Sequence, residues 1–246
     1  MIEKTHSIPT RAGAVDTFLC HPERNGPWPA IIFYMDAPGI REELRDMARR
    51  LASVGYYVLL PNLYYRAGAG TELGPDALKD ATPQRARMWE LMKSLSIELI
   101  MEDTASLLAF IDAQKEIRKD KIGVVGYCMS GPFVFSAAGR FPDRVKASAS
   151  IYGAGLVTER SDSPHLLAPK IKGEIYFACA EIDKYAPLPQ IENLRGVLTA
   201  AKTNFEIEIY PRTEHGFAFP QRYCYDKPGA ERHWERLFAL FGRTLR

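Results

Sequence analysis

The stretch VVGYCMSG, residues 124–131, places Cys128 between small residues at the end of an apolar run. A thiol can act as a nucleophile when a sharp strand-to-helix turn holds it up and a helix N-terminus faces it. Such a turn needs small residues two positions before and after the nucleophile, because the strand and the helix nearly collide there. Gly126 and Ser130 meet this requirement. The pattern G-x-C-x-S therefore predicts Cys128 as a nucleophile, with the backbone N–H of Met129 directed at an oxyanion.

A nucleophile on this type of turn needs a histidine base and an acid that orients it, in the chain order nucleophile, acid, histidine. Asp183 follows the strand-like segment GEIYFACA, and His215 follows the strand-like segment FEIEIYP. Catalytic groups of open α/β sheets gather at the carboxyl ends of the strands. The sequence therefore predicts a triad of Cys128, Asp183 and His215.

Each member of this set has an alternative that the residues leave open. The thiol could be inert core filling, as a buried cysteine usually is. Glu181 competes with Asp183, which could also be a surface acid or a helix cap, and His165 competes with His215. Ser130 could be the nucleophile, although it occupies the position where packing requires a small residue. The remaining cysteines are interpreted as structural: Cys20, Cys179 and Cys224.

The composition is that of an ordinary globular protein. With 46% hydrophobic and 25% charged residues, the 246-residue chain can bury a full core, and neither disorder nor membrane residence is indicated. The 32 basic and 30 acidic residues nearly cancel and form no basic block, which argues against a nucleic-acid partner. The start, MIEKTHSIPTRAG, lacks the apolar core of a signal peptide, and no apolar run approaches the ~20 residues of a membrane span. The four cysteines form no CxxC pair, which argues against a zinc site and favours free thiols in the cytoplasm.

Strand-like and helix-like segments alternate along the chain. The expected strands are residues 14–20, 30–35, 56–60, 121–127, 145–152, 173–180 and 205–211. The expected helices are residues 41–54, 82–93, 97–114, 129–140, 188–201 and 229–241. This alternation is typical of βαβ crossovers around a mostly parallel sheet. Because no linker, repeat or low-complexity tract interrupts it, we expect a single α/β domain over residues 1–246.

Nearly the whole chain resembles the dienelactone hydrolase family of α/β-hydrolases. The resemblance rests on four stretches: PAIIFYMDAPGIREELRDMARRLASVGYYVLLPNLYYR, KIGVVGYCMSGPFVF, CAEIDKYAP and RTEHGFAFPQRYCYD. It implies an α/β-hydrolase fold, with a mostly parallel sheet of about eight strands and helices on both faces. It also implies triad roles for Cys128, Asp183 and His215, with neither a metal nor an organic cofactor. Family substrates are small lactones or esters, and the namesake is a dienelactone that carries a carboxylate.

The family resemblance also assigns two residues before the first predicted helix. Members commonly have a glutamate close to the resting thiol, and this sequence has Asp36 there. A shorter acid would have to reach farther to support the thiol by a hydrogen bond. The N–H of the next residue, Ala37, is expected to be the second oxyanion donor.

The substrate contacts implied by the family differ at one position. Members that cleave the dienelactone bind its carboxylate with two arginines. One arginine matches Arg85, and Trp89 stands at a position that is often aromatic, although Arg85 could equally be a solvated helical residue. The other arginine would fall four residues after the catalytic histidine, where this sequence has Phe219, while Arg222 is nearby but out of register. We therefore expect an apolar contact at Phe219 in place of a charged one.

The leading hypothesis is a cysteine-dependent hydrolase of small lactones or esters. In it, His215, oriented by Asp183, takes the thiol proton and later activates water. A variant within this class is an acyl transferase or a hydrolase of another activated acyl compound. A different class is a redox-sensing or binding protein on the same scaffold, because fold alone does not define function. We expect a cytoplasmic monomer or small homo-oligomer with a small-molecule substrate.

Overall fold

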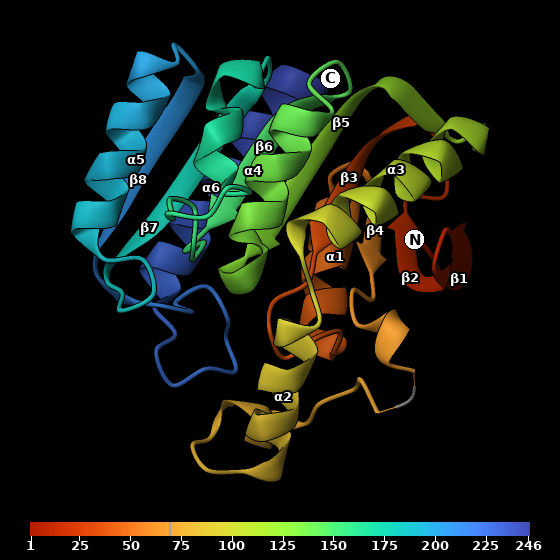
Figure 1. Ribbon diagram of the computed structural model, residues 1–246. Helices are drawn as coiled ribbons and strands as arrows, with labels where there is room; N and C mark the ends of the chain where they lie inside the picture. Colours follow the sequence, from red (N-terminus) through yellow and green to blue (C-terminus); the bar gives the residue numbers. More distant parts are fainter. Residues whose placement is uncertain (69) are drawn as a thin grey trace. The chain divides into compact units, whose positions relative to one another are not determined.

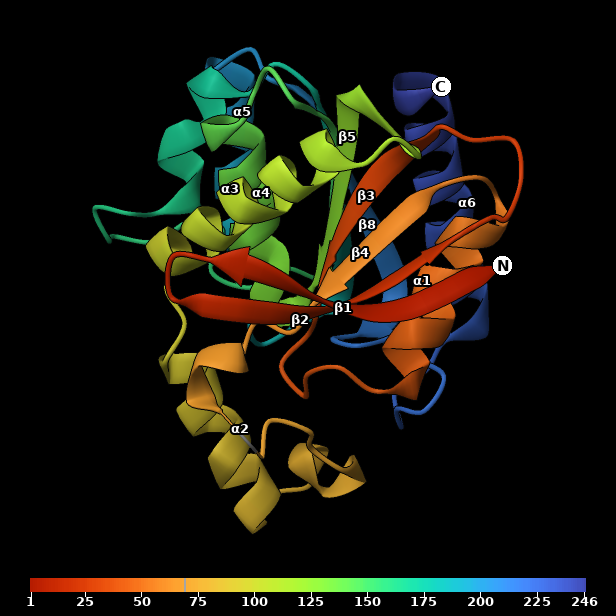
Figure 2. The same cartoon turned by 90° about the vertical axis from the view of Figure 1, so that its right-hand side faces the viewer.

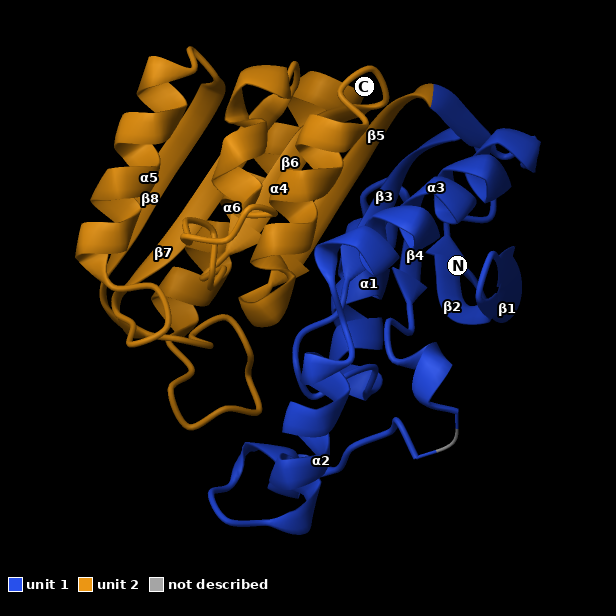
Figure 3. Cartoon of the chain, viewed as in Figure 1, with its two compact units in different colours: residues 1–119 blue, residues 120–246 orange. Residues whose placement is uncertain are grey.

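The computed structural model describes residues 1–68 and 70–246 of the chain (Figure 1). These residues divide into two compact units, residues 1–119 and residues 120–246 (Figure 3). Each unit contributes strands that its own helices cover. The prediction that residues 1–246 form a single domain stays a prediction.

Unit 1 contains strands in the order β1-β2-β4-β3. β1 (Ile2–Thr10) and β2 (Gly13–His21) form an antiparallel hairpin, and the two lie side by side in Figure 2. β2 also pairs antiparallel with β4 (Tyr57–Pro61), which runs parallel to β3 (Trp28–Tyr34). Every residue of β3 and β4 is buried, as the continuous apolar runs in these segments predict.

Three helices of unit 1 fall within the predicted segments. α1 (Glu42–Ser53) contacts β2 and β4 and buries Leu44, Met47 and Leu51, and α3 (Ile97–Ala113) contacts β1. α2 (Pro83–Lys93) begins after Thr82, whose hydroxyl accepts a hydrogen bond from the backbone N–H of Arg85. Two short 3₁₀ turns that the sequence did not predict lie between β4 and α2, namely η1 (Tyr65–Ala67) and η2 (Pro75–Leu78).

Unit 2 contains strands in the order β5-β6-β7-β8, and neighbouring strands are parallel. They are β5 (Ile117–Tyr127), β6 (Val145–Ile151), β7 (Glu174–Ile182) and β8 (Asn204–Glu214), and the first three residues of β5 still belong to unit 1. Because all four strands run the same way, their carboxyl ends meet at one edge. The segments that leave this edge carry the candidate catalytic residues.

Helices cover both faces of the unit 2 sheet. Successive side chains of β7 point to opposite faces, and each set contacts different helices. Phe177 and its neighbours two positions away pack with α4 (Gly131–Arg140) and α5 (Leu188–Ala200) in one buried apolar cluster. Tyr176 faces the other way, where its hydroxyl donates a 2.8 Å hydrogen bond to Glu208, the ion-pair partner of Arg236 on α6 (Lys227–Leu245). A further 3₁₀ segment, η4 (Pro164–Lys170), packs against α4 and α5.

The predicted mostly parallel sheet of about eight strands is confirmed, with antiparallel pairing between β1 and β2 and between β2 and β4. The sequence missed β1 because its side chains are largely exposed and polar, so no buried face marks it. It also ended β7 and β8 too early and made α6 too short. Within the part of the chain described, no helix has both the length and the apolar character needed to cross a membrane.

Candidate active site

Cys128 sits at the tip of a turn between β5 and α4. It follows the last residue of β5 directly and opens a short 3₁₀ turn, η3 (Cys128–Ser130), after which α4 begins. Its φ is +58°, a left-handed value that non-glycine residues rarely adopt and that is typically held at functional sites. The Cys128 carbonyl accepts a 3.1 Å hydrogen bond from the N–H of Ala154, and the side chain is half-buried. The predicted sharp strand-to-helix turn is therefore present.

The small residues of this turn are packed as the sequence pattern requires. A Cβ placed on Gly126 would lie 2.9 Å from the Ser130 Cβ and 2.9 Å from the Val134 Cγ2. A Cβ on Gly131 would lie 2.5 Å from the Cα of Gly153. Contacts this short are repulsive, so Gly126 allows β5 to approach α4 closely, and Gly131 allows α4 to approach the segment after β6.

We expect Gly126→Ala to lower the free energy of unfolding by about 1–3 kcal/mol, because the added methyl group overpacks the contact between β5 and α4. Urea denaturation would measure the change. Gly196→Ala is the matched control, since a Cβ at Gly196 in α5 meets no atom within 4 Å. Alanine in a helix interior is favoured over glycine by up to about 1 kcal/mol, so the control is expected to be neutral or stabilising. Equal effects of the two substitutions would contradict this account of the turn.

Asp183 and His215 are brought together at the carboxyl ends of neighbouring strands. Asp183 follows β7 and His215 follows β8, and the His215 Nδ1 lies 2.7 Å from the Asp183 Oδ2. The other carboxylate oxygen of Asp183 accepts backbone N–H bonds from Tyr185 at 2.8 Å and from Ala186 at 3.2 Å. The carboxylate is fully buried, so these bonds fix both its position and its orientation.

The two alternatives to this pair have other partners. Glu181 accepts a 2.7 Å hydrogen bond from the backbone N–H of Arg212, at the end of β8. His165 lies in η4, where its Nδ1 is 2.7 Å from the hydroxyl oxygen of Ser163. The contacts therefore favour Asp183 over Glu181 as the acid that orients His215.

The imidazole of His215 is nearly buried, and its pKa is raised to about 9. Burial has the largest single effect and lowers the pKa, but the interactions with Asp183 and with the neighbouring Cys128 together outweigh it. Nε2 is buried and forms no hydrogen bond with any residue that the structure describes.

Aromatic side chains enclose the imidazole. The ring centroids of Tyr152 and Tyr185 lie 5.0 Å and 4.9 Å from that of His215. Tyr152 is buried, whereas Tyr185 is 39% exposed and lies two residues after Asp183. Sequence reasoning missed both tyrosines. The only signal for Tyr185 was its place two residues after the predicted acid.

Phe219 is fully buried among aromatic side chains. Its ring centroid lies 5.3 Å from that of Tyr127 and 6.2 Å from that of Tyr152, and the Arg222 guanidinium carbon lies 4.5 Å from the Phe219 ring centroid. Phe219 therefore packs beside the turn that carries Cys128, and its expected contact with substrate stays a prediction. The Cys224 thiol donates a 3.3 Å hydrogen bond to the carbonyl oxygen of His215, which supports the same loop.

Asp36 and Ala37 lie in unit 1, in the loop that follows β3, and both are buried. Arg41 donates to Asp36 Oδ1 at 2.6 Å and to Asp36 Oδ2 at 3.1 Å, and it also pairs with Glu43. Burial lowers the pKa of Arg41, but the ion pairs with Asp36 and then Glu43 outweigh it and raise that pKa. Asp36 is thus held in a bidentate ion pair that the sequence did not predict.

Arg85 and Trp89 lie on α2, also in unit 1. Arg85 donates to the Leu78 carbonyl at 3.0 Å and pairs with Asp80 at 3.2 Å, and its guanidinium carbon lies 6.0 Å from the Trp89 ring centroid. Trp89 is 38% exposed, so it is not a core residue. Of the nine predicted site residues, unit 2 holds Cys128, Met129, Asp183, His215 and Phe219, and unit 1 holds the other four.

Among the described residues, no group of three or more His, Cys, Asp or Glu side chains is arranged to hold a metal ion. The mostly parallel sheet and the sharp turn after β5 define the chain as an α/β-hydrolase. The model of the dienelactone hydrolase family matches residues 15–245, so the chain belongs to the dienelactone hydrolase family. Its members are hydrolases that act on ester bonds.

Known proteins of this family are similar along nearly their whole length. A Synechocystis protein named "Putative carboxymethylenebutenolidase" is 28% identical over 244 residues, covering 98% of this chain and 96% of its own. The crystal structure of a "Putative Dienelactone Hydrolase" from Klebsiella pneumoniae has a TM-score of 0.87 at 25% identity and 98% coverage of both chains. The dienelactone hydrolase of Anabaena variabilis has the same fold, with a TM-score of 0.69 at 19% identity, covering 100% of this chain and 99% of its own.

Proposed function

We propose that this protein is a cysteine-dependent hydrolase of small lactones or esters. The observation that carries the proposal is the His215 imidazole, which Asp183 holds at 2.7 Å and whose pKa is raised to about 9 in part by Cys128. The strained turn at Cys128 supports the role of that residue as nucleophile. All four cysteines are unpaired, which supports a reducing compartment such as the cytoplasm.

In the proposed mechanism, the Cys128 thiol proton moves to the His215 Nε2 and the sulfur attacks the ester carbonyl carbon. The oxyanion accepts hydrogen bonds from the N–H groups of Met129 and Ala37. When the tetrahedral intermediate collapses, the alkoxide leaving group takes the proton from His215 and a thioester to Cys128 remains. Water then attacks the thioester while His215 takes one proton from it, and the thiol is restored as the acid product leaves.

The competing function is a redox-sensing or binding protein that uses Cys128 only as a reactive thiol. The purified protein incubated with an excess of an aryl acetate distinguishes the two. A hydrolase releases many equivalents of phenol and carries a transient acetyl group on Cys128, which intact-protein mass spectrometry detects after acid quench. A sensor thiol releases one equivalent at most and stays acetylated. Release that stops at one equivalent would therefore overturn the proposed function.

We also expect a neutral or aromatic ester to have a kcat/KM at least equal to that of a carboxylated dienelactone. The reason is Phe219, an apolar residue where the family resemblance implies the second carboxylate-binding arginine. A charge-assisted hydrogen bond contributes about 1.5–3 kcal/mol, so its loss costs a carboxylated substrate roughly tenfold to a hundredfold. Steady-state kinetics with the two substrates measures the ratio. A strong preference for the carboxylated lactone that Arg222→Ala removes would contradict the expectation and assign the missing role to Arg222.

A further inference from the structure

The segment from Asp36 to Gly39 is a tight turn. The N–H of Gly39 donates a 3.0 Å hydrogen bond to the carbonyl oxygen of Asp36, and the φ of Gly39 is +84°, a value that favours glycine. The Asp36 carbonyl and the Ala37 N–H belong to the same planar peptide group. The hydrogen bond from Gly39 therefore orients the plane that carries the Ala37 N–H.

The peptide plane on the other side of Ala37 is held by Tyr64. The Tyr64 hydroxyl donates a 2.7 Å hydrogen bond to the Ala37 carbonyl oxygen, and both residues are buried. A Cβ on Gly39 would lie 3.5 Å from Cε2 of Tyr64, so the tyrosine ring also packs against the turn. With both flanking planes fixed, the two backbone dihedrals of Ala37 have little freedom.

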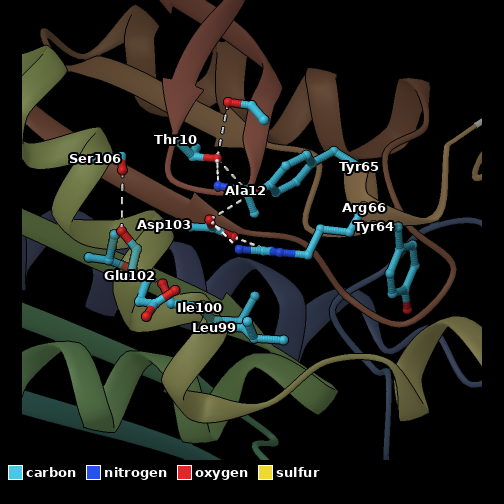
Figure 4. Close-up of polar contacts among 12 residues, drawn as sticks. Thr10, Ala12, Tyr64, Tyr65, Arg66, Leu99, Ile100, Glu102, Asp103 and Ser106 are labelled. Carbon is cyan, nitrogen blue, oxygen red and sulfur yellow. Dashed lines mark hydrogen bonds and ion pairs between the residues drawn. The ribbon is translucent and has the colours of Figure 1, made fainter.

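Tyr64 is itself anchored by the residues around it. Its N–H donates a 3.1 Å hydrogen bond to the side-chain oxygen of Asn62. Arg66 donates two 2.7 Å hydrogen bonds to the buried carboxylate of Asp103 on α3. In Figure 4, Tyr65 and Arg66 point toward Asp103, while the ring of Tyr64 lies apart from them. Tyr65 and Arg66 thus anchor the segment to α3, while the Tyr64 hydroxyl bonds the turn at Ala37.

We propose that Tyr64 is a positioning residue for the oxyanion donor at Ala37. The inference rests on the proposed function, in which the Ala37 N–H stabilises the oxyanion of the tetrahedral intermediate. Such a donor stabilises the transition state, so its N–H must already point at the position of the oxyanion when the negative charge develops there. Without the Tyr64 hydroxyl, the Ala37 carbonyl loses its buried donor, and its peptide plane can rotate to find another partner. That rotation moves Pro38 and Gly39 and so disturbs the Gly39 hydrogen bond to the Asp36 carbonyl, which releases the plane that carries the Ala37 N–H.

The test is Tyr64→Phe, with Tyr65→Phe as the matched control. Tyr65→Phe removes a hydroxyl from the next residue, which bonds Asp103 and Thr10, while Arg66 keeps its two bonds to Asp103. Complete loss of an oxyanion donor costs about 10²–10³-fold in kcat, and a misdirected donor is expected to cost about tenfold. We therefore expect Tyr64→Phe to lower kcat for an aryl acetate about tenfold with little change in KM. Tyr65→Phe is expected to change kcat less than twofold.

A transition-state mimic separates positioning from general loss of stability. An aryl trifluoromethyl ketone adds to the thiolate and forms an oxyanion, so its Ki is expected to rise in Tyr64→Phe by the same factor as kcat/KM falls. Equal kinetics in the Tyr64 and Tyr65 variants, or a Ki unchanged by Tyr64→Phe, would overturn the inference. The proposed function has its own test in Cys128→Ala. An inactive Cys128 variant together with a fully active Tyr64 variant means that only the positioning role is wrong.

Discussion

Cys128→Ala is expected to abolish ester turnover while the protein keeps its fold. Loss of the nucleophile from a triad that acts as a unit typically costs on the order of 10⁴-fold or more in kcat. The fold should survive, because alanine keeps the Cβ at the same backbone conformation and removes only a half-buried sulfur atom. The measurements are kcat for an aryl acetate and the midpoint of thermal unfolding.

Ser130→Ala is the control for the nucleophile. Ser130 is fully buried and its Cβ packs toward Gly126, so alanine preserves the contact that the turn needs. Most of the activity should therefore remain in this variant. If Cys128→Ala keeps its activity and Ser130→Ala loses it, the nucleophile is Ser130 and the proposed mechanism is wrong.

Asp183→Asn is expected to lower kcat by about 10⁴-fold, as the same change does in a serine triad. The asparagine oxygen can still accept the N–H bonds of Tyr185 and Ala186, so the loop keeps its shape. Its amide group, however, donates toward the His215 Nδ1 and favours the wrong tautomer. Glu181→Gln is the control, because glutamine can still accept the hydrogen bond from Arg212. If Glu181→Gln is inactive and Asp183→Asn is active, the acid that orients His215 is Glu181 and not Asp183.

The same variant should change the pH dependence of the rate. In the proposed mechanism, the imidazole keeps the proton that it takes from the Cys128 thiol at neutral pH, because the His215 pKa is raised to about 9, and this proton is then ready for the leaving group. Activity is therefore expected to fall as the pH rises through about 9. In Asp183→Asn, the hydrogen bond that raises the pKa is weakened, so any residual activity should fall at lower pH. Protonated His215 also stabilises the folded state, and this contribution is complete below the unfolded pKa of 6.5 and lost by about pH 9.

The sequence predicted the elements that carry the candidate site because their signals are local. The apolar runs of β5 and β7, the glycine two residues before Cys128, and the order of cysteine, aspartate and histidine are all visible without tertiary contacts. The glycine prediction in particular is confirmed by the 2.9 Å approach of Ser130 to a Cβ at Gly126.

Features that depend on packing between distant segments were not predictable. The Tyr64 hydroxyl bonds the backbone carbonyl of Ala37, 27 residues away, and the ion pair of Asp36 with Arg41 depends on the conformation of the loop after β3, so residue types alone give no signal for either. Phe219 was predicted as a substrate contact from its position four residues after His215, and this spacing does not determine the orientation of the ring, which is buried. These contacts form in the buried interior of the folded chain, and the sequence alone carries no signal for them.

The burial of Phe219 also limits how this protein can acquire a new substrate preference. The ring fills the space beside Tyr127 and Tyr152 and is covered by Arg222, so a single exchange for arginine would place a charge in an apolar enclosure. A single substitution at position 219 is consequently not expected to introduce a charged substrate contact, because the aromatic neighbours of the residue would have to change as well. Arg85 lies half-buried on α2, where its side chain bonds the Leu78 carbonyl and pairs with Asp80. The proposed carboxylate contact at Arg85 can therefore change by a single substitution, whereas a charge at position 219 cannot be introduced in one step.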